Sequence, residues 1–431
     1  MIKIGMVSLG CAKNLVDSEM VLGMLKQGNY EIVTNPKEAD GIIINTCGFI
    51  ESAKQEAIDT ILEMAQYHKK LIVIGCLVQR YLNDLKKELP EVDLFVAIRD
   101  YATINEKINA LFNDNSLKES LCPTQRVLST PKFTAYLRIS EGCNNRCTYC
   151  AIPLIRGSFK SRPLEELLKE ARQLADKGIK ELVIISQDTT RYGEDLSGDI
   201  TIVTLLKKLL EIKEFDYIRM LYLYPSEITD DLLYLISEEK RLTPYFDLPI
   251  QHASSKILKA MNRRGDKEFL LDLFSKTRRI IKNAVLRTTV IVGFPGETEE
   301  DFNELIDFIK TIKFDHLGAF TYSKEEDTVA YEMKNQIDEN VKVKRLEKLM
   351  QIQRKIAYDL NKTHIGEIME GLVVAKSIKP NEYEFRSGWN APDDVDGKII
   401  ISSNRKLEIG EKVKIKIVEA FAYDLYGELL N

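Results

Sequence analysis

Short apolar runs alternate with amphipathic helical segments along most of the chain's 431 residues. The runs "KIGMVSL", "GIIIN" and "KLIVIG" are each followed by a helical pattern, and six further runs between residues 134 and 334 repeat this arrangement. Continuous Ile and Val runs separated by helices indicate parallel sheets that are covered by helices on their faces. The chain is also longer than one hydrophobic core usually organises, so we expect two or three domains.

Changes in this pattern predict the domain organisation. Residues 1–112 are expected to form an open parallel α/β sheet, and the polar stretch 113–133, which carries two prolines, is expected to be a linker. Residues 134–334 fit a central partial (β/α)6 barrel, because eight strand–helix units would need more chain. Residues 335–365 predict one charged connecting helix. Residues 366–431 alternate short apolar runs with Gly, Pro and Asp turns, which predicts a small antiparallel β-barrel.

Composition narrows the classes of function. The net charge of -5 does not suggest a protein that wraps nucleic acid by charge alone. No apolar run is long enough to cross a membrane, and the start "MIKIGMVSLG" predicts a strand and not a signal peptide. We therefore expect a cytoplasmic protein, where thiols stay reduced. Its seven cysteines then favour metal or redox chemistry over disulfides.

Three cysteines share one loop, "EGCNNRCTYCAIP", in which Cys143, Cys147 and Cys150 have C-x3-C-x2-C spacing. The loop follows the first strand of the predicted barrel, so it is expected at the carboxyl-end mouth, where such folds place their chemistry. Thiolates are the usual ligands of iron–sulfur clusters, and three of them leave one iron of a four-iron cluster open. The alternative is a zinc site with a fourth ligand from elsewhere in the chain, because no histidine is near this loop.

A second set of three cysteines is spread over the first domain. Cys11, Cys47 and Cys76 each come just after an apolar strand, and each has a glycine beside it. Because neighbouring parallel strands end at one edge of a sheet, we expect the three thiols to converge there. The glycines would let the backbone approach a bulky group. The alternative is three buried structural cysteines, since free cysteine is often a core residue.

The cysteine loop resembles the C-x3-C-x-aromatic-C motif of the radical S-adenosylmethionine (SAM) enzymes, with Tyr149 as the aromatic residue. The resemblance implies that this loop holds a [4Fe-4S] cluster whose open iron binds SAM, and that the reduced cluster cleaves SAM to a 5′-deoxyadenosyl radical. The glycine-containing strand end of these enzymes is matched by "TTVIVGFPGE", where Gly293 and Gly296 would let the backbone approach adenine. The alternative is a plain strand-to-helix turn.

Two cysteine triads in one chain resemble the methylthiotransferases among the radical SAM enzymes. The stretches "SLGCAKNLVDSEM", "INTCGFIESAKQEAI" and "PIQHASSKILKAMNRRG" are similar to that family, the tail resembles a TRAM domain, and the resemblance covers nearly the whole chain. It implies a second [4Fe-4S] cluster, on the triad of the first domain. It also implies that the enzyme transfers a methylthio group to an unactivated C–H bond.

The stretches "SLGC-K-NLVDSE", "QDTTRYG" and "YDLYGEL" are most similar to the subfamily that modifies the β-carbon of an aspartate in small-subunit ribosomal protein S-twelve. A tRNA adenosine methylthiotransferase is the nearest alternative, and a zinc-binding translation factor without catalysis is a distant one. Residues 366–431 hold 9 Lys plus Arg and 12 Asp plus Glu, a net charge of -3. An acidic tail suits a basic ribosomal protein better than tRNA phosphates, so RNA binding is not expected to dominate.

The positions of several other residues in the chain make them candidates for binding SAM or the substrate. The candidates for the SAM pocket, at or near predicted strand ends, are Gln187, Asp188, Gln251, His252 and Arg287. The candidates for substrate contact in the tail, which could equally be a solvated turn, are Trp389, Asp393, Asp394 and Asp396. The resemblance further implies an electron donor of the flavodoxin or ferredoxin type.

Overall fold

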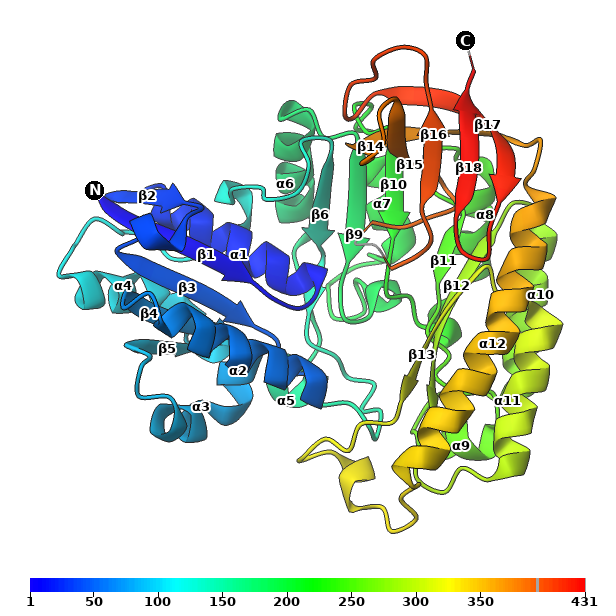
Figure 1. The fold of residues 1–431 in the computed structure, drawn as a ribbon, viewed down its shortest axis with the longest axis horizontal. Coiled ribbons are helices and arrows are strands. Elements are labelled where there is room, and N and C mark those ends of the chain that lie inside the picture. Colours follow the sequence, from blue (N-terminus) through cyan, green and yellow to red (C-terminus); the bar gives the residue numbers. More distant parts are fainter. Residues whose placement is uncertain (393–394, 431) are drawn as a thin grey trace.

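The structure is a computed structural model, and it describes residues 1–392 and 395–430. An N-terminal parallel sheet, a central half-open barrel and a small C-terminal barrel lie around a common centre, with one long helix along the side (Figure 1). This arrangement confirms the predicted fold class. The predicted domain boundaries stay a prediction.

Residues 2–97, all of them described, contain a five-stranded parallel sheet in the order β2-β1-β3-β4-β5. Its strands are β1 (Ile2–Ser8), β2 (Tyr30–Val33), β3 (Gly41–Thr46), β4 (Lys70–Gly75) and β5 (Leu94–Ala97). Its helices are α1 (Ala12–Leu25), α2 (Glu51–Ala65), α3 (Cys76–Glu88) and α4 (Ile104–Phe112). One apolar cluster joins the sheet to α2 and α3, and another joins it to α1 and α4, so both faces are covered. The short edge strands β2 and β5 were not among the predicted runs.

Six parallel strands form the predicted partial barrel in two groups, β10-β9-β6 and β11-β12-β13. Between the groups, β10 and the segment before β11 share only an isolated bridge, Ile218 with Leu242. The strands are β6 (Thr134–Arg138), β9 (Glu181–Ile185), β10 (Tyr217–Met220), β11 (Tyr245–Asp247), β12 (Val285–Val292) and β13 (His316–Thr321). The outer helices are α6 (Leu164–Asp176), α7 (Ile202–Leu209), α8 (Asp230–Glu238), α10 (Lys267–Ile280) and α11 (Glu299–Ile312).

Alternation along β12 shows how the barrel strands divide their side chains between two faces. Leu286, Val290 and Val292 join the apolar core under the helices, whereas Arg287 and Ile291 on the other face are only half-buried. The second face lines the inside of the half-open barrel. Short elements complete this part, namely β7 (Ser140–Glu141), α5 (Ile152–Arg156), β8 (Lys160–Ser161) and α9 (Ser255–Ala260).

Helix α12 (Glu339–Thr363) runs along α11 and β13 and reaches the C-terminal barrel (Figure 1). The barrel closes in the order β14-β15-β16-β18-β17. Its strands are β14 (Ile368–Lys376), β15 (Glu382–Arg386), β16 (Ile399–Ser402), β17 (Lys412–Ala420) and β18 (Leu425–Leu429). One pair, β16 with β18, is parallel, which differs from the expected antiparallel arrangement. Hydrophobic alternation reports which face of a strand is buried and not its direction.

The segment 113–133 follows the surface of α1 without any strand, but it is anchored by buried charge. Arg126, 2% exposed, pairs with Glu19 of α1 at 2.9 Å and with Glu170 of α6 at 3.0 Å. It thus ties the N-terminal sheet to the central barrel.

The C-terminal barrel packs over the amino-terminal ends of the central strands. Arg386 pairs with Glu181, the first residue of β9, at 2.6 Å, and Arg219 donates a hydrogen bond to the Ser387 carbonyl at 2.6 Å. A shared apolar cluster includes Val16 of α1, Val183 of the central barrel and Val373 of the C-terminal barrel. None of the helices in the described part of the chain is both long and apolar enough to cross a membrane.

Candidate functional site

The loop that carries Cys143, Cys147 and Cys150 is closed at its base and pinned along its length. Strands β7 and β8 pair on either side of it, and the Cys143 amide donates to the Gly157 carbonyl at 3.2 Å. Gly142 begins the loop at φ +75, where a Cβ would overlap the backbone of Ser158. The Cys150 amide donates back to the Cys147 carbonyl at 3.0 Å. The loop is therefore preformed by backbone contacts.

The three thiols of this loop influence one another. Desolvation raises the pKa of Cys150 to about 12, and the charges of Cys147 and Cys143 act in the same direction. Burial also raises the pKa of Cys143, to which the charges of Asp188 and Cys147 add. These interactions mean that the three thiols lie near one another. Burial therefore disfavours the thiolate forms of Cys143 and Cys150, whereas a bound metal centre deprotonates its thiol ligands.

The structure also brings the second triad together. Cys11 lies at the start of α1, Cys47 directly follows β3, and Cys76 is the first residue of α3. Burial raises the pKa of Cys76 to about 11, and the charges of Cys11 and Cys47 raise it further. A Cβ on Gly10 would lie 2.9 Å from Cys47 Cβ, so a larger residue would obstruct the approach of these two loops. Convergence at one sheet edge is thus present as predicted.

Both triads suit an iron–sulfur cluster in the chemistry of their donors. Thiolates are the ligands that such clusters use, and each group offers three of them on preformed backbone. Within the described residues, no three Cys, His, Asp or Glu side chains are gathered closely enough to hold a single metal ion. A four-iron cluster is wider than one ion, so its thiolates stand further apart. The role of the six cysteines as ligands stays a prediction.

Arg156 connects the two cysteine triads. It ends α5, just after the loop of Cys150, and its Nη2 lies 3.4 Å from Cys76 Sγ and 2.6 Å from Asn14 Oδ1. Its Nη1 donates to Asp17 at 2.8 Å, and Asp17 also accepts from Arg138 at 2.6 Å. The sequence analysis missed this buried network. Its available signal was the charge of Arg156 at the end of the otherwise apolar stretch "IPLIR".

Two of the predicted SAM-pocket residues lie beside the cysteine loop. Asp188 is 1% exposed and accepts hydrogen bonds from Asn145 of the loop at 2.7 Å and from Thr190 at 2.8 Å. Burial raises the pKa of the Asp188 carboxyl group. Gln187 Nε2 donates to Glu141 at 2.7 Å, whereas its buried Oε1 has no partner among the described residues.

His252 belongs to the support of the glycine turn. It is fully buried, its Nδ1 accepts from the Ser254 amide at 2.9 Å, and its Nε2 is 3.6 Å from Glu297. Glu297 accepts from the amides of Gly293 at 2.7 Å and Phe294 at 3.3 Å, so one carboxylate shapes the turn. Gln251, before it, has φ +69 and bridges to Val290 of β12 through its backbone.

The two glycines of this turn have different surroundings. Both have positive φ, +75 at Gly293 and +82 at Gly296. A Cβ on Gly293 would overlap the Lys342 side chain of α12, whereas a Cβ on Gly296 would meet nothing within 4 Å. Gly293 is therefore required for packing against α12, whatever its part in binding adenine. Gly296 has open space beside it.

Tyr149 lies within the cysteine loop, and Arg263 lies against the loop at Cys147. Burial raises the pKa of Tyr149 well above its usual value, and the ring packs against a small apolar cluster that contains Met261 and Phe294. Arg263, which the sequence analysis missed, lies 3.9 Å from Cys147 Sγ and over the ring of Tyr224 at 4.1 Å. Arg263 therefore places a positive charge beside one thiol of the loop.

Arg287 does not lie at a strand end. It is the third residue of β12 and pairs with Asp247 at 2.6 Å and with Asp396 of the C-terminal barrel at 3.4 Å. The Asp396 side chain is fully buried and accepts from the Tyr245 hydroxyl at 2.6 Å. Trp389 is 4% exposed, and its backbone carbonyl accepts a hydrogen bond from His316 Nε2 at 2.7 Å. This burial counts against direct contact of Trp389 or Asp396 with a partner protein.

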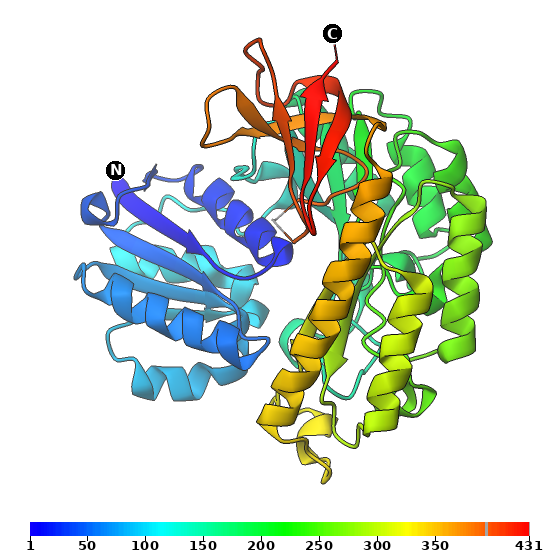
Figure 2. The ribbon, with the colours of Figure 1, turned by 45° about the vertical axis from the view of Figure 1, so that its right-hand side comes forward.

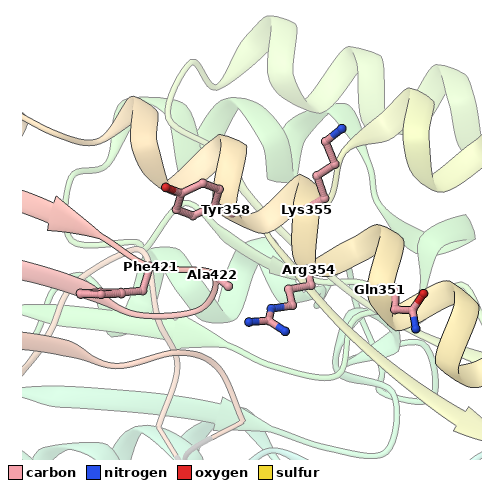
Figure 3. Close-up of a pocket in the computed structure, with 6 residues that line it drawn as sticks. All are labelled: Gln351, Arg354, Lys355, Tyr358, Phe421 and Ala422. Atoms are coloured by element: carbon pink, nitrogen blue, oxygen red, sulfur yellow. The ribbon is translucent and has the colours of Figure 1, made fainter.

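Asp393 and Asp394, the other two candidates for substrate contact, lie outside the described residues. A separate groove of about 440 Å³ lies between α12 and the loop that joins β17 to β18 (Figure 3). The residues that line it are Gln351, Arg354, Lys355, Tyr358, Phe421 and Ala422. No cysteine lines this groove, so it is not part of the candidate site.

Family models match three parts of the chain. They are an uncharacterized protein family, UPF0004, over residues 3–97, the radical SAM superfamily over residues 137–309, and the TRAM domain over residues 365–430. These three matches fall on the N-terminal sheet, the central barrel and the C-terminal barrel.

Curated relatives match over the full length. The chain is 48% identical to the ribosomal protein uS12 methylthiotransferase RimO of Caldicellulosiruptor saccharolyticus, with 100% of both chains covered. It is 47% identical to the protein of the same name from Clostridioides difficile, which covers 100% of this chain and 99% of that one. Alignments of this length leave no part of the chain without a counterpart.

Solved structures share the fold at low sequence identity. The radical SAM methyltransferase TsrM from Kitasatospora setae, with cobalamin and a [4Fe-4S] cluster bound, is 12% identical with a TM-score of 0.56. That match covers 95% of this chain and 84% of TsrM. The cobalamin-dependent radical SAM enzyme OxsB is 13% identical with a TM-score of 0.51, over 82% of this chain and 56% of OxsB.

Proposed function

The chain belongs to the RimO family of ribosomal protein uS12 methylthiotransferases, and we propose that its two cysteine triads act together on one aspartate of that protein. It is a radical SAM enzyme that uses SAM and [4Fe-4S] clusters, and its substrate is uS12, the small-subunit protein S-twelve. The observation that carries the proposal is the convergence of two separate thiol triads in one chain that matches RimO along its whole length.

Each triad would hold one cluster. The ligands of the cluster that binds SAM would be Cys143, Cys147 and Cys150. The ligands of the auxiliary cluster would be Cys11, Cys47 and Cys76. When bound, SAM and the two clusters supply the radical cleavage of an unactivated C–H bond and the methylthio group, which side-chain acids and bases do not provide.

The residues of the chain position these groups. Asp17 and Arg156 hold the N-terminal sheet against the barrel, so that the two triads keep a fixed relation. Asn145 and Asp188 hold the cysteine loop over the strand ends. Glu297 holds the glycine turn that would receive adenine. Such fixed positioning is what a radical reaction requires from its protein.

The proposal also includes the atom that is modified and the protein that donates electrons. We infer that the methylthio group is added at the β-carbon of the aspartate, as the resemblance to the subfamily implies. Reduction of a [4Fe-4S] cluster that cleaves SAM requires a low-potential one-electron donor. A flavodoxin or ferredoxin fits this requirement.

The proposal is tested by anaerobic incubation of the reconstituted protein with SAM, dithionite and either uS12 or tRNA. Mass spectrometry should find one methylthio group on the uS12 aspartate and none on tRNA. The wild-type protein should bind about eight irons, and replacement of either triad by alanine should leave about four and abolish product.

Cys122→Ala is the matched control, because Cys122 lies in the segment 113–133, outside both triads. It should keep the iron content and the activity of the wild-type protein. Modification of tRNA alone, or an iron content that survives the loss of a triad, would overturn the proposal.

A further inference from the structure

Lys13 reaches from the auxiliary triad to the mouth of the central barrel. It is the second residue of α1, two residues after Cys11, and it is 8% exposed. Its Nζ lies 3.2 Å from the ring centroid of Tyr222, which follows β10. In Figure 2 the first turn of α1, in dark blue, lies toward the centre of the molecule, between the N-terminal sheet and the barrel.

The ammonium group of Lys13 has no carboxylate partner among the described residues. The nearest acid along the helix, Asp17, is engaged by Arg138 and Arg156 instead. The ionisable groups that interact with Lys13 are Tyr222, Cys11 and Arg156. Lysine is almost never fully buried unless it is paired, and an ammonium carries three donors. A ring face satisfies one side of the cation, so the site can still accept an anion.

The Lys13 ammonium group lies between the start of α1, which follows Cys11, and the mouth of the central barrel. The target β-carbon has to lie within reach of both triads, and Lys13 is held beside Cys11 at one end and over Tyr222 of the barrel mouth at the other. In an aspartate the carboxyl carbon is bonded directly to the β-carbon. A residue that fixes the carboxylate therefore fixes the reacting carbon to within one bond.

We propose that Lys13 binds the side-chain carboxylate of the target aspartate of uS12. This inference rests on the proposed function, because it names the contact that the same site makes with its substrate. The pair would form only when the aspartate enters, and it would distinguish an aspartate from an asparagine of the same shape. An amide leaves the buried ammonium without a counter-charge, whereas a carboxylate neutralises it.

This contact is tested by measuring substrate affinity for combinations of protein and substrate variants, with reconstituted protein under conditions in which no turnover occurs. Titration calorimetry would measure the affinity of wild type, Lys13→Met and Lys13→Arg for uS12 and for uS12 with its target aspartate changed to asparagine. Wild type should prefer the aspartate form by about tenfold or more, as expected for a buried charge pair. Lys13→Met should bind both forms equally, and Lys13→Arg should keep part of the preference.

Lys26→Met is the matched control, because Lys26 is an exposed lysine at the other end of the same helix. It should keep the full preference for the aspartate form. An unchanged preference in Lys13→Met would overturn the inference. So would loss of about half the iron in that variant, which would mean that Lys13 serves the auxiliary triad.

The failure of the inference is distinguishable from the failure of the proposed function. If uS12 is not the substrate, wild type will neither bind it nor modify it, and both ideas fall together. If only the role of Lys13 is wrong, wild type will modify uS12 and Lys13→Met will retain its preference for aspartate.

Discussion

Arg156 is the residue through which the two triads are mechanically linked. Its guanidinium group contacts Asn14 and Asp17 of α1 and Cys76 of α3, while its backbone belongs to α5. A planar group with several donors can satisfy three partners at once, which the single ammonium of lysine cannot do with the same geometry. The residue thus serves as a rigid connection between two domains.

Replacement of Arg156 by methionine should destabilise the protein strongly. It would leave Asp17 with Arg138 as its one remaining cation and remove a donor from Cys76, and loss of one member of a buried ion network costs about 3–5 kcal/mol. Urea unfolding of the apo protein should show this loss in the free energy of unfolding, and Arg156→Lys should recover part of it. Arg405→Met, which removes an exposed ion pair with Glu411, is the control and should change little. Equal effects of the two methionine variants would contradict this account.

The turn between β12 and α11 was predicted from its glycines. The structure shows two contacts that give the turn its shape. "GFPGE" was interpreted as a backbone approach to adenine or as a plain turn. In the structure the Glu297 carboxylate folds the turn, and α12 packs against Gly293 so closely that no side chain fits. The second contact involves a helix that comes about fifty residues later, so no local pattern could reveal it.

Alanine at the two glycines of this turn should separate packing from backbone strain. Both positions have positive φ, so both variants carry the strain of about 1–2 kcal/mol that an L-residue meets there. Gly293→Ala must also displace the buried Lys342 side chain, whereas Gly296→Ala meets open space. Thermal unfolding should therefore show a clearly larger loss for Gly293→Ala. Equal losses would mean that α12 adjusts without cost.

At the scale of the whole molecule, the sequence predicted those contacts that follow from the order of strands in a parallel sheet. Parallel strands end together, so Cys11, Cys47 and Cys76 could be predicted to converge before their surroundings were known. Arg287 shows the limit of this approach. Its partner Asp396 belongs to another domain, and the docking of two domains leaves no periodic pattern in either one.

One buried carboxylate, Glu181, takes part in the contact between the C-terminal barrel and the central barrel. Glu181 accepts from Arg386 of the C-terminal barrel at 2.6 Å and from Arg219 of the central barrel at 3.2 Å. Burial alone would raise the pKa of Glu181, but these two arginines lower it below the usual value of 4.5. The folded state therefore binds the proton of this carboxyl group less readily than the unfolded chain does.

Because the pKa of Glu181 is lower in the folded state than in the unfolded chain, the stability of the protein depends on pH. The stabilisation from Glu181 is fully present above about pH 4.5, and it is lost as the pH falls toward the lower pKa of the folded state. Glu181→Gln should lower the free energy of unfolding at pH 7 by about 3 kcal/mol, because the buried Arg219 and the half-buried Arg386 lose their partner. It should also flatten the decline of stability below pH 4.5, since the titrating group is gone. Urea unfolding at pH 7 and pH 4 measures both effects, and an acid decline as steep as that of the wild type would show that other carboxylates control it.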